Sequence, residues 1–197
     1  VGSPPETRGL TIVTNSLDAA IVLSRASRLE VYNIGGTVSP ITRAQEGDWA
    51  VREMERLHVD VSVVCPAGIS VERGLTQATP AAAAVSQVEV ASGDRVISLA
   101  GADSFGMSAF VQFASLEQID SIAVTGSPNE AALQPFLERG ITIIYLGHYA
   151  SETLGVQALA AEVARRDPGR AGAVMAHHDD VGAERVEVAH RVDERLA

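Results

Sequence analysis

Residues 10–36 read LTIVTNSLDAAIVLSRASRLEVYNIGG and contain one complete strand, helix and strand pattern. Two short runs rich in β-branched residues, 10–14 and 29–34, flank a segment from Ser16 to Ala26 whose apolar residues recur at helical intervals. Asn15 or Ser16 can cap this helix, because short polar side chains accept hydrogen bonds from the free N–H groups at a helix start. The order of these elements predicts an α/β fold with a parallel sheet.

The same alternation continues toward the C-terminus. Further strands are predicted at 59–65, 95–100, 121–125 and 141–146. Helices are predicted over 48–57, after Thr79-Pro80, after a Ser127 cap and over 151–166. Because several strands are apolar on both alternating faces, we predict a mostly parallel, Rossmann-like sheet with helices on both faces. The expected core contains Val61, Val63, Ile97, Leu99, Ile122, Val124, Ile143 and Tyr145.

The charged residues exclude several classes of function. The chain has 197 residues and a formal net charge of −10, and all 15 of its basic residues are arginine. The absence of lysine excludes a Schiff-base lysine and a phosphate-binding loop that depends on lysine. A negative field repels phosphate backbones and anionic lipids, so we expect no nucleic-acid binding by this chain alone and no membrane association.

Cysteine content and hydropathy suggest a compartment. The single cysteine, Cys65, cannot form a disulfide framework or a cysteine-rich zinc site. No apolar run approaches the length of a membrane span, and the first residues lack the layout of a signal peptide. We therefore expect a cytoplasmic protein. Because the sequence does not begin with Met, we also expect it to start within a longer gene product.

Two motifs follow the first two strands. Thr14, Asn15 and Ser16 lie where a strand ends and a helix begins, which is where parallel sheets bind ligands and where a helix start can hold a phosphate. The alternative is that Asn15 and Ser16 only cap the helix. Gly35 and Gly36 permit a ligand to approach the backbone closely, or they form only a tight turn.

Three segments carry a family resemblance over about residues 9–126. They read TIVTNSLDAAIVLSRASRLEVYNIGGTVSP, GDWAVREMERLHVDVSVVCPAGISVERGLT and DRVISLAGADSFGMSAFVQFASLEQIDSIAVTG. In this order they resemble the sensor domain of DeoR-type bacterial transcription regulators. The resemblance implies a fold like that of ribose-5-phosphate isomerase, a small-molecule effector of the sugar-phosphate type, and a helix-turn-helix before the sensor. By analogy it also implies a homo-oligomer and a binding role rather than an enzyme.

The resemblance also identifies the expected ligand-binding residues. The TNS turn and the glycines of the family pattern are retained, whereas charged positions are changed: Ala67 replaces an acid, Gly101 an aspartate and Ser104 a lysine. Asp103 could replace the lost acid if its loop shifts. The resemblance therefore implies an altered pocket without catalytic residues. Its expected ligand-binding residues are Thr14, Asn15, Ser16, Gly35, Gly36, Gly68, Asp103 and Ser104.

A second resemblance covers about residues 126–166. The segment GHYASETLGVQALA resembles the C-terminal part of the type 2 GTP cyclohydrolase homologue family, which holds two divalent metals. This resemblance implies that His148 and Glu152 bind a metal such as zinc or manganese, and it offers a hydrolase-like protein as the alternative function. Two ligands are fewer than the three or four of a tight zinc site, so the first expectation is that no cofactor is bound.

These patterns divide the chain into three parts. We expect a disordered N-terminal stub at 1–8, an effector-sensing α/β domain at 9–147, and a helical C-terminal extension and tail at 148–197.

Overall fold

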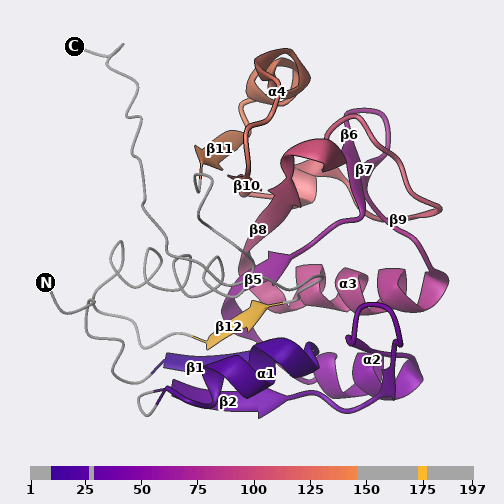
Figure 1. The fold of residues 1–197 in the computed structure, drawn as a ribbon, viewed down its shortest axis with the longest axis vertical. Helices are drawn as coiled ribbons and strands as arrows, with labels where there is room; N and C mark the ends of the chain where they lie inside the picture. The colour runs from indigo at the N-terminus through magenta and orange to yellow at the C-terminus, as the bar shows by residue number, and fades with distance from the viewer. Residues whose placement is uncertain (1–9, 27–28, 146–172, 177–197) are drawn as a thin grey trace, which may run out of the picture.

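The computed structural model describes residues 10–26, 29–145 and 173–176, and its centre is a seven-stranded sheet. The strands lie in the order β11-β10-β8-β5-β12-β1-β2, and every neighbouring pair is parallel (Figure 1). This arrangement confirms the predicted parallel sheet. The strands are β1 (Leu10–Thr14), β2 (Leu29–Asn33), β5 (Val59–Val64), β8 (Gly93–Gly101), β10 (Ser121–Thr125), β11 (Thr142–Tyr145) and β12 (Ala173–Ala176).

Helices pack on both faces of the sheet, as predicted. Successive side chains of a strand point to opposite faces. Ile12 belongs to the buried cluster that contains Leu23, whereas Val13 belongs to the cluster that contains Met54 and Val85. One face is therefore covered by α1 and the other by α2 and α3. The helices are α1 (Leu17–Leu23), α2 (Asp48–Met54), α3 (Pro80–Ser92) and α4 (Glu130–Leu137).

A second, antiparallel sheet was not predicted. It consists of β6 (Gly68–Ser70), β7 (Gly74–Gln77) and β9 (Val111–Ala114), and short 3-10 helices, η1 (Ala102–Ser104) and η2 (Leu116–Gln118), flank β9. A two-stranded hairpin, β3 (Thr37–Val38) and β4 (Gln45–Glu46), follows β2. The small sheet and α4 share the largest buried cluster, in which the rings of Phe105 and Phe136 meet edge to face at 5.4 Å.

The core agrees with the prediction except at its edge. Five of the expected residues are buried, and Leu99 and Ile143 are partly buried. Tyr145, however, is 41% exposed, because it lies on the edge strand β11 at the border of the sheet. Helix α4 is also capped by Asn129, whose side chain accepts from the N–H of Ala131 at 2.9 Å, and not by Ser127.

The strand order reverses at β12. From β1 the chain adds β2 on one side, whereas β5, β8, β10 and β11 extend the sheet in the opposite direction. Residues 173–176, within the part expected to be a helical extension and tail, form a strand paired with both β1 and β5. A four-residue apolar run cannot be assigned to strand or helix from periodicity alone. The rest of 148–197 and the stub at 1–8 lie outside the described residues.

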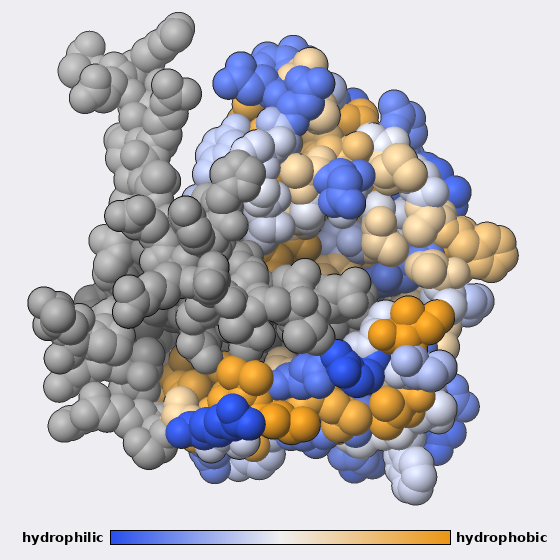
Figure 2. Space-filling model, in the orientation of Figure 1, coloured by the Kyte–Doolittle hydropathy of each residue, from blue (hydrophilic) through white to orange (hydrophobic). Residues whose placement is uncertain are grey.

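The surface that carries α1 is uneven in hydropathy. Figure 2 shows hydrophobic residues gathered over α1 and its neighbouring strands at the bottom of the view, and hydrophilic residues over α4 at the top. Ile21 of α1 is 56% exposed. Within the described ranges, no helix is both long enough and apolar enough to cross a membrane.

Candidate functional site

The predicted ligand-binding residues gather at the carboxyl edge of the parallel sheet. Thr14 ends β1 and is followed by the β1–α1 turn, and the loop after β5 leads from Cys65 to Gly68 at the start of β6. This turn and this loop border the position of β12, where the strand order reverses. Open α/β sheets bind ligands in the crevice at such a switch point. Because β12 lies between β1 and β5, the ends of β1 and β5 are two strand spacings, or about 10 Å, apart. We call this place the switch-point crevice.

The polar side chains of the β1–α1 turn are buried and bonded within the protein. Thr14 Oγ1 accepts a hydrogen bond from the N–H of Ser16 at 3.1 Å, and Ser16 Oγ accepts from the N–H of Ala19 at 3.2 Å. Asn15 Nδ2 donates to the carbonyl of Gln45 at 3.3 Å. All three side chains are at most 1% exposed. They cap α1 and fasten the β3–β4 hairpin to the end of β1.

The backbone donors at the start of α1 are also engaged. The N–H of Leu17 donates to the carbonyl of Arg43 at 3.3 Å, and the N–H of Ala20 donates to the carbonyl of Ser16 at 3.0 Å. A phosphate at this turn would compete with these bonds. The geometry thus favours the capping role for Asn15 and Ser16, and their contact with a ligand stays a prediction.

The predicted glycines differ in what surrounds them. A Cβ on Gly36, which has φ +148°, would lie 2.8 Å from the carbonyl oxygen of Glu46. A Cβ on Gly68 would lie 2.8 Å from the carbonyl oxygen of Met107. Both glycines are therefore required by chain packing. Gly35 has no atom within 4 Å of such a Cβ, so it borders open space.

Asp103 and Ser104 lie in η1, after β8. The exposed Asp103 side chain turns back toward the strand end, because a Cβ on Gly101 would be 2.7 Å from its Oδ1. Since β8 is beyond β5, the predicted set extends from the end of β2 to the end of β8, or about 19 Å at ordinary strand spacing. One small metabolite can contact only part of this set.

Arg43 brings a cation to the β1–α1 turn, and the sequence analysis missed it. Its guanidinium Nη2 lies 2.7 Å from Asp18 Oδ2, and its side chain is about half exposed. It is the one non-glycine residue with positive φ, at 53°, in the described part of the chain. No sequence motif distinguishes Arg43 from the other arginines among the 15 in the chain.

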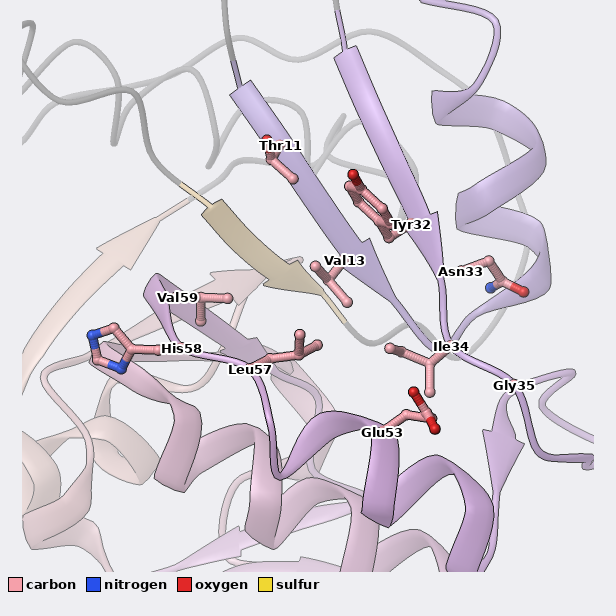
Figure 3. Close-up of a pocket in the computed structure, with 10 residues that line it drawn as sticks. All are labelled: Thr11, Val13, Tyr32, Asn33, Ile34, Gly35, Glu53, Leu57, His58 and Val59. Carbon is pink, nitrogen blue, oxygen red and sulfur yellow. The ribbon is translucent and has the colours of Figure 1, made fainter.

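A separate groove lies between α2 and the sheet. Figure 3 shows side chains of β1 and β2 above the groove and side chains of α2 and the residues after it below. The cavity has a volume of about 370 Å³. Gly35 is the predicted site residue that lines it. The lining residues are Thr11, Val13, Tyr32, Asn33, Ile34, Gly35, Glu53, Leu57, His58 and Val59.

The predicted metal ligands, His148 and Glu152, lie outside the described residues. Within the described ranges, no group of three or more His, Cys, Asp or Glu side chains could hold a metal ion. A metal at His148 and Glu152 therefore stays a prediction.

Comparison with known proteins identifies the chain's relatives. The family model of the DeoR C terminal sensor domain matches residues 5–126. The HTH-type transcriptional repressor GlcR of Bacillus subtilis is 30% identical over 134 residues, which are 68% of this chain and 52% of GlcR. The HTH-type transcriptional regulator GlpR of Haloferax volcanii is 33% identical over 132 residues, 67% of this chain and 51% of GlpR. The transcriptional repressor AccR of Agrobacterium fabrum is 28% identical over 133 residues, 67% of this chain and 51% of AccR.

The chain thus spans about half the length of these curated relatives. The family match ends at residue 126 and these relatives are transcription regulators, so the resemblance of residues 126–166 to the type 2 GTP cyclohydrolase homologue family finds no support among them. The match to the sensor family covers more than half of the chain and includes the loops that follow β1, β5 and β8. The chain therefore belongs to the DeoR C-terminal sensor domain family.

Proposed function

We propose that this chain is the effector-sensing domain of a transcription regulator and that it binds a phosphorylated, sugar-type metabolite in the switch-point crevice. The observation that carries the proposal is the family match over residues 5–126. That segment contributes β1, β5, β8 and the loops at their carboxyl ends, which is where sheets of this type bind ligands.

The phosphate has few partners among the residues that the structure describes. The protein contains no lysine, and the N–H groups of Ser16 and Leu17 are already bonded. Arg43 is the cation next to the turn, and Asp18 competes with a phosphate for its guanidinium. With a net charge of −10, the long-range field also opposes an anion. The affinity for a sugar phosphate is therefore weaker than micromolar and depends on Arg43.

The effector signal reaches DNA through another part of a regulator. An acidic chain of this kind is a poor partner for DNA, so the proposed role is to bind the effector and to pair with further copies. Hydrophobic residues gather over α1 in Figure 2, and Ile21 there is 56% exposed, which supports self-association. If effector binding changes how the copies pair, it would alter the affinity of the regulator for its operator.

The test is a thermal-shift and calorimetry panel of triose, pentose and hexose phosphates together with the same sugars lacking phosphate. We expect at least one phosphorylated compound to raise Tm and its dephosphorylated form to have no effect. Arg43→Gln abolishes that shift, while Arg52→Gln, an exposed arginine of α2, keeps it. Ala67→Trp, at an exposed position in the loop after β5, blocks the crevice and also abolishes it. A full panel without any response contradicts the proposal.

A further inference from the structure

The groove beneath β1 and β2, which we call the α2 groove, is distinct from the switch-point crevice. The crevice lies at the carboxyl ends of β1 and β5, whereas the α2 groove runs along the face of β1 and β2 that is turned toward α2 (Figure 3). Its volume of about 370 Å³ falls within the range of small-molecule sites.

The floor of the α2 groove is apolar. Val13, Ile34 and Val59 are each less than 9% exposed, and Leu57 is partly buried beside them. The ring of Tyr32 is 52% exposed and stands over this floor. Such a surface suits an aliphatic body packed against an aromatic ring.

One carboxylate, that of Glu53, lines the α2 groove, and a second, that of Glu30, lies next to two of its lining residues. Glu53 of α2 is exposed and points toward the strands in Figure 3. Glu30 lies beside Tyr32 and Thr11, because its Oε1 accepts from the Tyr32 hydroxyl at 2.8 Å and its Oε2 accepts from Thr11 Oγ1 at 3.5 Å. In the described part of the chain neither carboxylate forms an ion pair, since the two ion pairs there join Arg43 to Asp18 and His58 to Asp94.

The tyrosine at the rim stays neutral. The hydrogen bond to Glu30, and then the charge of Glu30, raise the pKa of Tyr32 above its ordinary 10.0. The phenol therefore remains protonated near neutral pH, and the negative charge at the groove comes from the two carboxylates.

We propose that the α2 groove binds a small organic cation, an ammonium group carried on an aliphatic body. The body covers Val13, Ile34 and Leu57, and the ammonium lies beside the carboxylate of Glu53 and the ring of Tyr32, both of which line the groove. Carboxylates attract the charge, and the face of an aromatic ring adds a cation–π contribution.

The ligand proposed for the α2 groove and the proposed effector carry opposite charges. Among the residues that line the groove there is no arginine, and the one imidazole, that of His58, lies 3.1 Å from Asp94, so a phosphate there would meet the carboxylate of Glu53, which has no described ion pair. The two sites thus select for opposite charge, and this proposal does not depend on the proposed function.

Three probes with one aliphatic body test the charge preference. Calorimetry of the full chain at neutral pH would compare n-hexylammonium, n-hexanol and hexanoate. We expect the ammonium to bind about tenfold more tightly than the alcohol and the carboxylate to show no binding. Equal affinity for the three probes, tighter binding of hexanoate, or no binding of any probe at millimolar concentration overturns the proposal.

Matched glutamate variants then locate the site. Glu53→Gln reduces the affinity for hexylammonium about fivefold and leaves that for hexanol unchanged, because it removes one charge and keeps the shape. Glu55→Gln is the control, since Glu55 is also exposed but lies two positions later, at the C-cap of α2, and so on another side of the helix. If Glu53→Gln and Glu55→Gln behave alike, the ammonium does not lie in the α2 groove and the proposal fails.

Discussion

The β1–α1 turn and the α2 groove both adjoin strand β1, but their polar groups have different roles. In the turn, Thr14, Asn15 and Ser16 are buried, and each has a hydrogen bond to a defined atom of the protein. At the groove, Glu53 stands exposed over an apolar floor and forms no described ion pair. Polar side chains at the end of a strand can therefore serve to hold the fold together. Exposed polar groups without a described ion pair, next to an apolar surface, can instead bind a ligand.

Substitutions in these two regions should have different effects on the protein. Changes in the turn remove hydrogen bonds or close packing that stabilise the fold, so they lower the free energy of unfolding. Changes to exposed groups at the groove, such as the Glu53 carboxylate, remove little that stabilises the fold, so they alter ligand binding and leave stability nearly unchanged. Matched pairs of residues, one from each region, test this division.

The largest difference is expected between two adjacent glycines. Gly36→Ala places a Cβ 2.8 Å from the Glu46 carbonyl at φ +148°, so strain and overpacking lower the free energy of unfolding by about 3 kcal/mol. Gly35→Ala enters open space at the edge of the groove and changes stability by less than about 1 kcal/mol. Urea unfolding of both variants measures the difference. Equal losses would contradict the packing role assigned to Gly36.

The next largest difference is expected between two threonines of β1. Thr14→Val removes the acceptor of the Ser16 N–H in a fully buried position and costs about 2 kcal/mol. Thr11→Val removes only a 3.5 Å contact with Glu30 and changes stability by about 0.5 kcal/mol or less. The same unfolding experiment measures both values. A larger loss for Thr11→Val than for Thr14→Val would reverse the comparison.

The parallel sheet could be predicted because its strands are chemically distinctive. The prediction at 121–125 coincides with β10, whose five residues are buried or partly buried between neighbouring strands. The small antiparallel sheet could not be predicted, since its strands have three or four residues and contain Gly, Ser, Thr and Gln. Tertiary packing holds it: Ile69, Leu75 and Phe113 belong to the largest buried cluster. At Gly74, φ is +60° and a Cβ would clash with the carbonyl oxygen of Ala114, so β7 and β9 lie close together.

The candidate site was predictable in position and not in detail. The sequence predicted that Thr14, Asn15 and Ser16 lie where a strand ends and a helix begins, and the structure confirms this placement. It could not predict that the N–H of Leu17 donates to the Arg43 carbonyl. Nor could it predict that the side-chain amide of Asn15 donates to the Gln45 carbonyl, because both contacts join residues far apart in the chain. The α2 groove was missed for the same reason. Thr11, Tyr32 and Glu53 come from three elements, and each alone looks like an ordinary surface residue.

A smaller difference is expected between two serines at the ends of α1. Ser16→Ala removes the N-cap hydrogen bond to the N–H of Ala19 and lowers the free energy of unfolding by about 1 kcal/mol. Ser24→Ala, at the other end, removes an exposed 3.0 Å hydrogen bond to the Ile21 carbonyl and costs about 0.5 kcal/mol or less. Thermal unfolding resolves the two, and Ser16→Asp, which keeps an acceptor at the cap, should restore most of the loss. An unchanged Tm for Ser16→Ala would show that the turn does not depend on this cap.

The smallest effect is expected at the rim of the groove, where Glu30 changes the ionisation of Tyr32 with little effect on stability. The hydrogen bond and the charge of Glu30 raise the pKa of Tyr32 above 10.0, so folding favours the neutral phenol. This contribution is complete below the unfolded pKa and is lost only as the pH rises through the folded pKa, so it adds no pH dependence to stability near neutral pH. Glu30→Ala should return the pKa of Tyr32 toward 10.0, and Glu30→Gln, which keeps an acceptor without the charge, should lower it less. Absorbance of tyrosinate follows the titration, and Tyr32→Phe assigns the signal among the three tyrosines of the chain. A pKa of Tyr32 that is the same in all Glu30 variants would mean that the carboxylate does not bond to the phenol in solution, and the acidic rim of the α2 groove would then lie elsewhere.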